Sequence, residues 1–94
     1  DILYIKSDGS YSELYLVDGT KRTLSKKLKL FQETLKDENF YRIHNSYLIN
    51  LSHVKKFHRT DGGRVQMIND IFLPISKLKL DEFKKTINKT YLKL

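Results

Sequence analysis

Hydrophobic and polar residues alternate along the first 24 positions, as they do in half-buried β-strands. The runs ILYIKS, SYSELYLV and TKRTL therefore predict three short strands. Asp8-Gly9 and Asp18-Gly19 separate these runs, and Asp-Gly between alternating runs is a strong hairpin signal because glycine accepts a positive φ. The pattern predicts an antiparallel meander at the start of the chain.

In the next segment the hydrophobic residues recur every three or four positions instead of every second one. Leu28, Phe31 and Leu35 recur at helical spacing, and Ser25 has the side chain of a helix N-cap. One short amphipathic helix packed against a sheet is expected here.

Extended patterns return from residue 40 onward, in the runs FYRI, SYLIN, HVKKFHR, RVQMI and IFLPIS. Pro74 lacks a backbone N–H, so its strand is expected at a sheet edge or at its own end. The last segment, DEFKKTINKTYLKL, places Phe83, Ile87 and Tyr91 on one helical face. The expected fold is mostly β, with layered short strands, one short internal helix and a C-terminal helix.

Composition and charge narrow the classes of function. With 94 residues the chain can form one small domain, and without cysteine it can form neither disulfides nor thiolate metal sites. Eighteen Lys and Arg against eleven Asp and Glu give a net charge of +7. Such an excess favours a polyanionic partner, whereas lysine-rich surfaces in general often serve solvation alone.

The sequence offers no convincing catalytic or metal-binding constellation. His44, His53 and His58 have no cysteine partners and no carboxylate at ligand spacing. His44 and Ser46 stand two residues apart, but no G-x-S-x-G elbow or orienting acid accompanies them. We therefore expect a protein that is not an enzyme and that has no cofactor or metal.

A polar cluster, His44-Asn45-Ser46, interrupts the most hydrophobic passage of the chain, YRIHNSYLINL. The longer segment FYRIHNSYLINLSHVKKF resembles the pattern F-x-R-I-H-R-S-Y-L-V-N of the LytTR family of bacterial DNA-binding domains. Three further segments, ILYIKSDGSYSELYLVDG, TLSKKLKLFQETL and FLPISKLKLDEFKK, are similar to the family's opening hairpin, helical segment and closing L-P-V-S-R stretch. All four occur in family order.

The resemblance implies a fold and a mechanism. Residues 1–94 would be a single LytTR-like domain with a layered β sandwich, forming the C-terminal part of a longer cytoplasmic response regulator. Such domains bind promoter DNA in pairs on direct repeats, with loops that enter successive major grooves. The implied partners are double-stranded DNA and an upstream receiver domain, and the isolated domain would be a monomer that pairs on DNA.

Three residues match family positions that contact bases. Asn45 can bond adenine bidentately, although the family more often has Arg at this position. Lys77, in PISK, also replaces an Arg, and Lys lacks the bidentate fork. Tyr11 follows the first Asp-Gly turn, where it can contact DNA or simply pair with an aromatic residue across the hairpin.

A second group is expected to contact phosphates: Arg42, His44, Ser46, Lys55, Lys56 and Arg59. For His44 a structural hydrogen bond is favoured over a phosphate contact, and for Asn50 a turn-forming bond to local backbone is favoured. The polar cluster would then surface between core strands, with Arg42 and Asn45 toward DNA and His44 and Ser46 bracing the loop.

Two other functions remain open at this stage. Tyr4, Tyr11, Tyr15, Tyr41 and Tyr47 make a single-stranded nucleic-acid module conceivable, through base stacking. A basic protein- or membrane-interaction domain is the other alternative.

Overall fold

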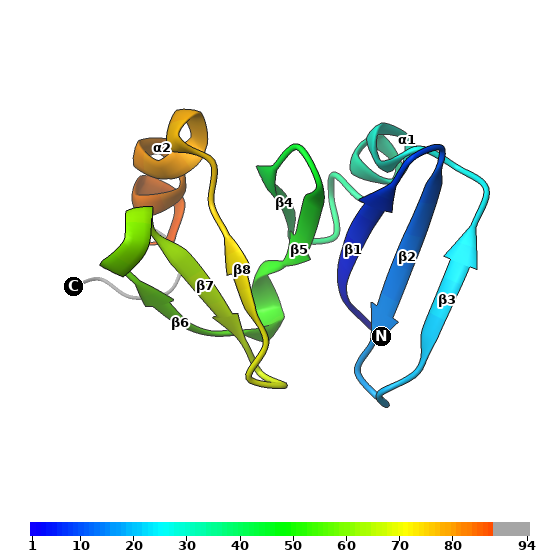
Figure 1. The fold of residues 1–94 in the computed structure, drawn as a ribbon, viewed down its shortest axis with the longest axis horizontal. Coiled ribbons are helices and arrows are strands. Elements are labelled where there is room, and N and C mark those ends of the chain that lie inside the picture. Colours follow the sequence, from blue (N-terminus) through cyan, green and yellow to red (C-terminus); the bar gives the residue numbers. More distant parts are fainter. Residues whose placement is uncertain (88–94) are drawn as a thin grey trace.

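The computed structural model describes residues 1–87, which form two antiparallel sheets and two α-helices (Figure 1). The strands are β1 (Ile2–Asp8), β2 (Tyr11–Leu16), β3 (Lys21–Leu24), β4 (Phe40–His44), β5 (Tyr47–Asn50), β6 (Val54–His58), β7 (Arg64–Met67) and β8 (Phe72–Pro74). The α-helices are α1 (Leu28–Thr34) and α2 (Lys77–Ile87), and short 3₁₀ turns span Leu51–His53 and Thr60–Gly62.

The larger sheet has five strands in the order β3-β2-β1-β5-β4. The predicted meander β1-β2-β3 is confirmed, and both Asp-Gly turns use glycine at positive φ, 62° at Gly9 and 91° at Gly19. β5 then pairs antiparallel with β1, so the β4–β5 hairpin is added to the far side of the meander.

The smaller sheet has the order β6-β7-β8. Pro74 closes β8, which lies at an edge of this sheet as its missing N–H predicts. Gly63, at φ 96°, precedes β7, and a Cβ there would lie 2.8 Å from the Leu80 side chain of α2. A glycine is therefore required where this sheet meets α2.

The five-stranded sheet carries a hydrophobic cluster on each face. One cluster joins it to the smaller sheet and α2, through Ile43 and Ile49 on one side and Met67 and Phe83 on the other. The second cluster, Ile5, Leu14, Leu28 and Leu48, joins it to α1. Leu3 and Tyr4 follow one another in β1, yet both belong to the first cluster. The pairing of β1 with β2 shifts register between Ile2 and Tyr4, and such an irregularity allows two successive side chains to face the same side of the sheet.

Both helices begin at positions other than those the sequence predicts. Ser25 is not the N-cap of α1, since Lys27 holds that position without a side-chain cap. The segment before α1 is bound to the sheet, because the hydroxyl of the buried Ser12 donates to the Lys26 carbonyl at 2.6 Å.

α2 begins at Lys77, before the expected helical segment, which starts at Asp81. Leu80 lies one turn before Phe83 on the apolar face and also packs against the core. Its burial stabilises an additional helical turn at the N-terminal end of α2. Tyr91, expected on the same face, lies outside the described residues.

The mostly β, layered fold with two helices is confirmed. None of the helices that the structure describes is long and apolar enough to cross a membrane.

Candidate nucleic-acid interface

Three chain turns lie along one edge of the molecule, the upper edge in Figure 1. They are the β1–β2 turn, the β4–β5 turn and the junction of β8 with α2. Two backbone hydrogen bonds hold them in this order: Ser7 N–H donates to the Ser46 carbonyl at 2.9 Å, and Ser76 N–H donates to the Ile43 carbonyl at 2.8 Å. We call this edge the turn edge.

The turn edge carries all three residues that the sequence proposes for base contacts. Tyr11 begins β2 directly after the Gly9-Ser10 turn and is half exposed. Asn45 lies exposed in the β4–β5 turn, and Lys77 is the exposed first residue of α2. Residues separated by more than 60 positions are thus brought to one edge by the pairing of β1 with β5 and the packing of β8 and α2 beside β4.

Arg42 holds the β4–β5 turn from within. Its Nε donates to the His44 carbonyl at 2.9 Å, and its Nη2 donates to the Asn45 carbonyl at 2.6 Å. Its Nη1 donates to the Gln32 side chain of α1 at 2.8 Å. The planar fork of the guanidinium suits this arrangement, and partial burial lowers the pKa of Arg42. Sequence reasoning assigned Arg42 to a phosphate, and nothing in the chain's pattern indicated its bonds to the turn carbonyls.

His44 and Ser46 complete the turn. Ser46 N–H donates to His44 Nδ1 at 3.1 Å, which requires an unprotonated Nδ1. The ring proton of neutral His44 therefore lies on Nε2. The expected structural bond of His44 is confirmed, and Nε2–H is the donor through which the predicted phosphate contact would have to be made.

Asn50 behaves as the sequence predicts. Its side-chain oxygen accepts from Ser52 N–H at 3.0 Å and caps the following 3₁₀ turn. Its amide also donates to the Ile2 carbonyl at 3.0 Å, which joins β5 to the start of the chain.

A shallow depression of about 260 Å³ lies between the β4–β5 turn and the start of α2. Arg42, His44 and Asn45 line one side, and Ser76 and Lys79 line the other. The first turn of α2 contains no acidic residue, and the N-terminus of a helix is itself positive. Lys79 Nζ lies 3.8 Å from Glu82 Oε2 in the next turn, so exposed Lys77 is the main positive side chain at this end of the turn edge.

Two exposed lysines that precede α1 also lie near the turn edge. The bond from Ser12 to the Lys26 carbonyl fixes the segment that contains exposed Lys26 and Lys27 next to the residue that follows Tyr11. Their position depends on a bond between residues 14 apart in the chain, so no local pattern could have revealed it.

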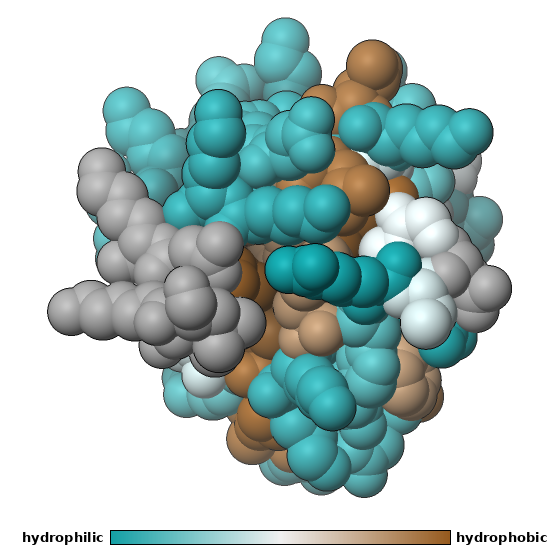
Figure 2. All heavy atoms as spheres, turned by 90° about the vertical axis from the view of Figure 1, so that its left-hand side faces the viewer, coloured by the Kyte–Doolittle hydropathy of each residue, from teal (hydrophilic) through white to brown (hydrophobic). Residues whose placement is uncertain are grey.

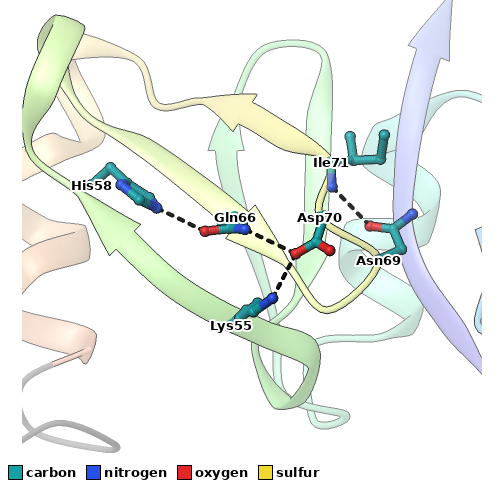
Figure 3. A network of polar contacts seen from close by, with 6 residues as sticks. All are labelled: Lys55, His58, Gln66, Asn69, Asp70 and Ile71. Carbon is teal, nitrogen blue, oxygen red and sulfur yellow. Dashed lines mark hydrogen bonds and ion pairs between the residues drawn. The ribbon is translucent and has the colours of Figure 1, made fainter.

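The remaining predicted phosphate contacts lie elsewhere. Lys55 and Lys56 lie on β6, and Arg59 follows it; β6 runs along the side of the molecule opposite the turn edge (Figure 1). Lys55 Nζ lies 2.7 Å from Asp70 Oδ1. Gln66 Nε2 donates to the same oxygen at 2.9 Å and its Oε1 lies 2.8 Å from His58 Nε2 (Figure 3).

This network of His58, Gln66, Asp70 and Lys55 ties β6 to β7 and to the turn before β8. The bonds from Lys55 and Gln66 lower the pKa of the Asp70 carboxyl. The Lys55 charge is thus already partnered within the protein. Lys56 and Arg59 are exposed, but they lie on this same side of the molecule, so we do not expect them to contact the DNA that faces the turn edge.

The aromatic residues are mostly turned inward. Tyr4 is buried and stacks on Tyr15 with ring centroids 4.6 Å apart. Tyr15 donates to Glu13 at 3.0 Å, and burial with this bond raises the pKa of Tyr15 to about 12. Tyr41 and Tyr47 pack against the core. Of the five tyrosines considered for base stacking only Tyr11 is exposed, so these tyrosines do not form a stacking platform for a single strand.

The face formed by the smaller sheet and α2 is covered by long hydrophilic side chains over a narrow hydrophobic strip (Figure 2). Lysine and arginine stems can cover apolar surface in this way while their charged ends stay in water. Within residues 1–87, no group of three or more His, Cys, Asp or Glu side chains could hold a metal ion.

An edge of exposed polar turns on a basic domain can present side chains to the phosphates and base edges of DNA. The family model described as the LytTr DNA-binding domain matches residues 1–88. The chain belongs to this family.

Two curated relatives agree with this assignment. An uncharacterised response regulatory protein of Vibrio cholerae is 31% identical over 88 residues, which cover 89% of this chain and 34% of the relative. The CO-responsive transcriptional regulator RcoM of Rhodospirillum rubrum is 29% identical over 62 residues, covering 66% of this chain and 26% of the relative. The chain therefore spans about a third or less of the relatives that it matches.

The fold also matches a solved structure. A LytTr DNA-binding domain from Bacillus cereus, described as part of a methyl-accepting/DNA response regulator, superposes with a TM-score of 0.82. The match covers 92% of this chain and 80% of the other at 20% identity.

Proposed function

We propose that this domain binds duplex DNA sequence-specifically at promoter direct repeats, with the turn edge facing the DNA. Asn45 and Lys77 contact base edges in the major groove, and Tyr11 contacts DNA at the other end of the edge. The domain acts in the cytoplasm as the output part of a two-component regulator, joined to an upstream receiver domain.

The observation that carries this proposal is the alignment of the three turns. Hydrogen bonds fix the three turns side by side along one edge of the molecule. Side chains from all three can therefore face the same stretch of duplex DNA. The net charge of +7 supplies attraction to phosphates.

The proposed residue roles follow from the chemistry of each turn. Asn45 has a short amide side chain on a turn that Arg42 holds in place, which suits bidentate bonding to adenine. Lys77 offers a point charge, which suits a guanine acceptor or a phosphate with less discrimination than Arg. Nε2–H of His44 and the Ser46 hydroxyl would donate to phosphates beside Asn45.

Selection from a pool of random duplexes tests the proposal. Wild-type protein would be taken through several rounds at near-physiological salt, in parallel with Asn45→Ala and Lys77→Ala. Lys56→Ala serves as the matched control, because it removes an exposed charge from β6 and leaves the turn edge intact.

We expect wild-type protein and Lys56→Ala to enrich the same repeated motif, and the two turn-edge variants to lose preference at separate positions of it. Binding without enrichment, weakened uniformly by salt, would contradict sequence-specific reading. Equal competition by single strands would favour the alternative of a single-stranded nucleic-acid module instead.

A further inference from the structure

Leu78 is the most exposed of the large hydrophobic residues that the structure describes. Its exposed fraction is 95%, whereas the next, Tyr11, has 50%. A side chain with this exposure contributes almost nothing to the core, so folding gives no reason for a leucine at this position. Its neighbours on the same helix, Leu80 and Phe83, account for the packing of α2.

The position of Leu78 sets it apart from other exposed apolar residues. It is the second residue of α2, directly after Lys77, and it lines the same depression as Asn45 and Arg42. Ile68 and Ile71, by contrast, lie at the β7–β8 turn, on the opposite side of the molecule from the turn edge (Figure 1).

The surroundings of Leu78 indicate which partner fits it. Exposed Lys77 precedes it, and the first turn of α2 has no acidic residue, so an apolar group on an anionic partner is favoured. Lys79, on the other side of Leu78, lies 3.8 Å from Glu82. The major groove of DNA presents one such group, the C5-methyl of thymine, beside the acceptors that polar side chains read.

Resting on the proposed function, we propose that Leu78 contacts the 5-methyl group of a thymine next to the bases contacted by Asn45 and Lys77. The domain then recognises one base of its DNA site by an apolar contact. This contact adds base discrimination next to Lys77, which by itself distinguishes bases weakly. Leu78 is thereby a specificity-determining residue that polar-contact reasoning does not identify.

Replacing thymine by deoxyuridine tests this directly, because it removes the methyl group and keeps base pairing. The duplex enriched by wild-type protein would be remade with deoxyuridine at each thymine in turn, around the positions at which Asn45→Ala and Lys77→Ala lose preference. Affinities would be measured for wild-type protein, Leu78→Ala and the matched control Ile71→Ala, after thermal unfolding confirms that all three are equally folded.

At one position we expect wild-type protein and Ile71→Ala to lose about fourfold in affinity without the methyl group, the factor that corresponds to one buried methyl-sized group. Leu78→Ala should bind the thymine duplex about fourfold more weakly and lose nothing further on deoxyuridine. Equal losses for wild-type protein and Leu78→Ala, or no loss for wild-type protein at any of these thymines, would overturn the inference. Failure of wild-type protein to enrich any duplex would instead refute the proposed function.

Discussion

The turn edge and the β6 surface, which carries Lys55, Lys56 and Arg59, both present basic residues, but they use them differently. On the turn edge Arg42 is bound to backbone carbonyls, and exposed Asn45 lies in the turn that it supports. On the β6 surface Lys55 is paired with Asp70 inside a network that links neighbouring strands. The charges in the sequence therefore do not by themselves identify a binding surface, because the fold gives Arg42 and Lys55 partners within the protein.

The largest expected effect is the loss of Asn45. Asn45→Ala should weaken binding to the selected duplex by about 1–3 kcal/mol and relax preference at one base, because the amide makes the bidentate contact. Unfolding temperature should stay the same, since Asn45 is exposed. Affinity measured by fluorescence anisotropy checks this, and a loss as large in Lys56→Ala would remove the distinction between the two surfaces.

Arg42 should act through the turn rather than through its charge. Arg42→Gln and Arg42→Lys should both weaken binding by about 1–2 kcal/mol, because neither side chain can reach both turn carbonyls as the guanidinium does.

The salt dependence of affinity distinguishes this role from the predicted phosphate contact. A positioning role leaves the slope of log K against log salt unchanged in both variants. A phosphate anchor would lower the slope by about one in Arg42→Gln while Arg42→Lys bound nearly as well as wild-type protein.

Substitutions of Lys77 should have smaller effects on DNA binding than those of Asn45 and Arg42, and alanine and arginine should act in opposite directions. Lys77→Ala should cost about 1 kcal/mol of affinity, and Lys77→Arg should sharpen the preference for guanine at its position, because Arg presents a bidentate fork. Repeating the selection with both variants measures this. Unchanged motifs in both would place Lys77 away from the bases.

The smallest effect on DNA binding should come from Lys55. Lys55→Met removes the main cause of the lowered pKa of Asp70, so that pKa should rise toward its ordinary value, while DNA affinity changes by less than about 0.5 kcal/mol. A carboxyl titration by NMR gives the pKa of Asp70.

The sign of the stability effect follows from the direction of the shift. Because folding lowers the pKa of Asp70, its ionised form stabilises the wild-type protein above the ordinary Asp pKa. This contribution is lost as the pH falls through the folded-state value. The stability of Lys55→Met should therefore fall less on acidification than that of wild-type protein. An unchanged pKa of Asp70 in this variant would show that Lys55 does not stabilise the ionised carboxylate in solution.

The sequence predicted the strands and turns well because alternation and Asp-Gly pairs are local signals. Even the polar cluster His44-Asn45-Ser46 was correctly placed between core strands, as a turn. The helix starts were wrong because they depend on distant contacts: Ser12 bonding Lys26 before α1, and Leu80 packing on the core in α2.

The same limit applies to the candidate site. Family resemblance pointed to Tyr11, Asn45 and Lys77, and the fold brings their turns to one edge. The internal bonds of Arg42 and the pairing of Lys55 with Asp70 involve residues up to 15 positions apart, on different elements. Patterns of residue type along the chain carry no information on which charges the fold has already neutralised.

The central claim is that DNA meets the turn edge and not the β6 surface, and mapping of backbone amide shifts by NMR during titration with the selected duplex tests it most directly. We predict that the largest shifts cluster at residues 8–11, 43–46 and 76–79, with residues 54–58 of β6 little changed. Shifts concentrated on β6 and β7, with the three turns unaffected, would contradict the account.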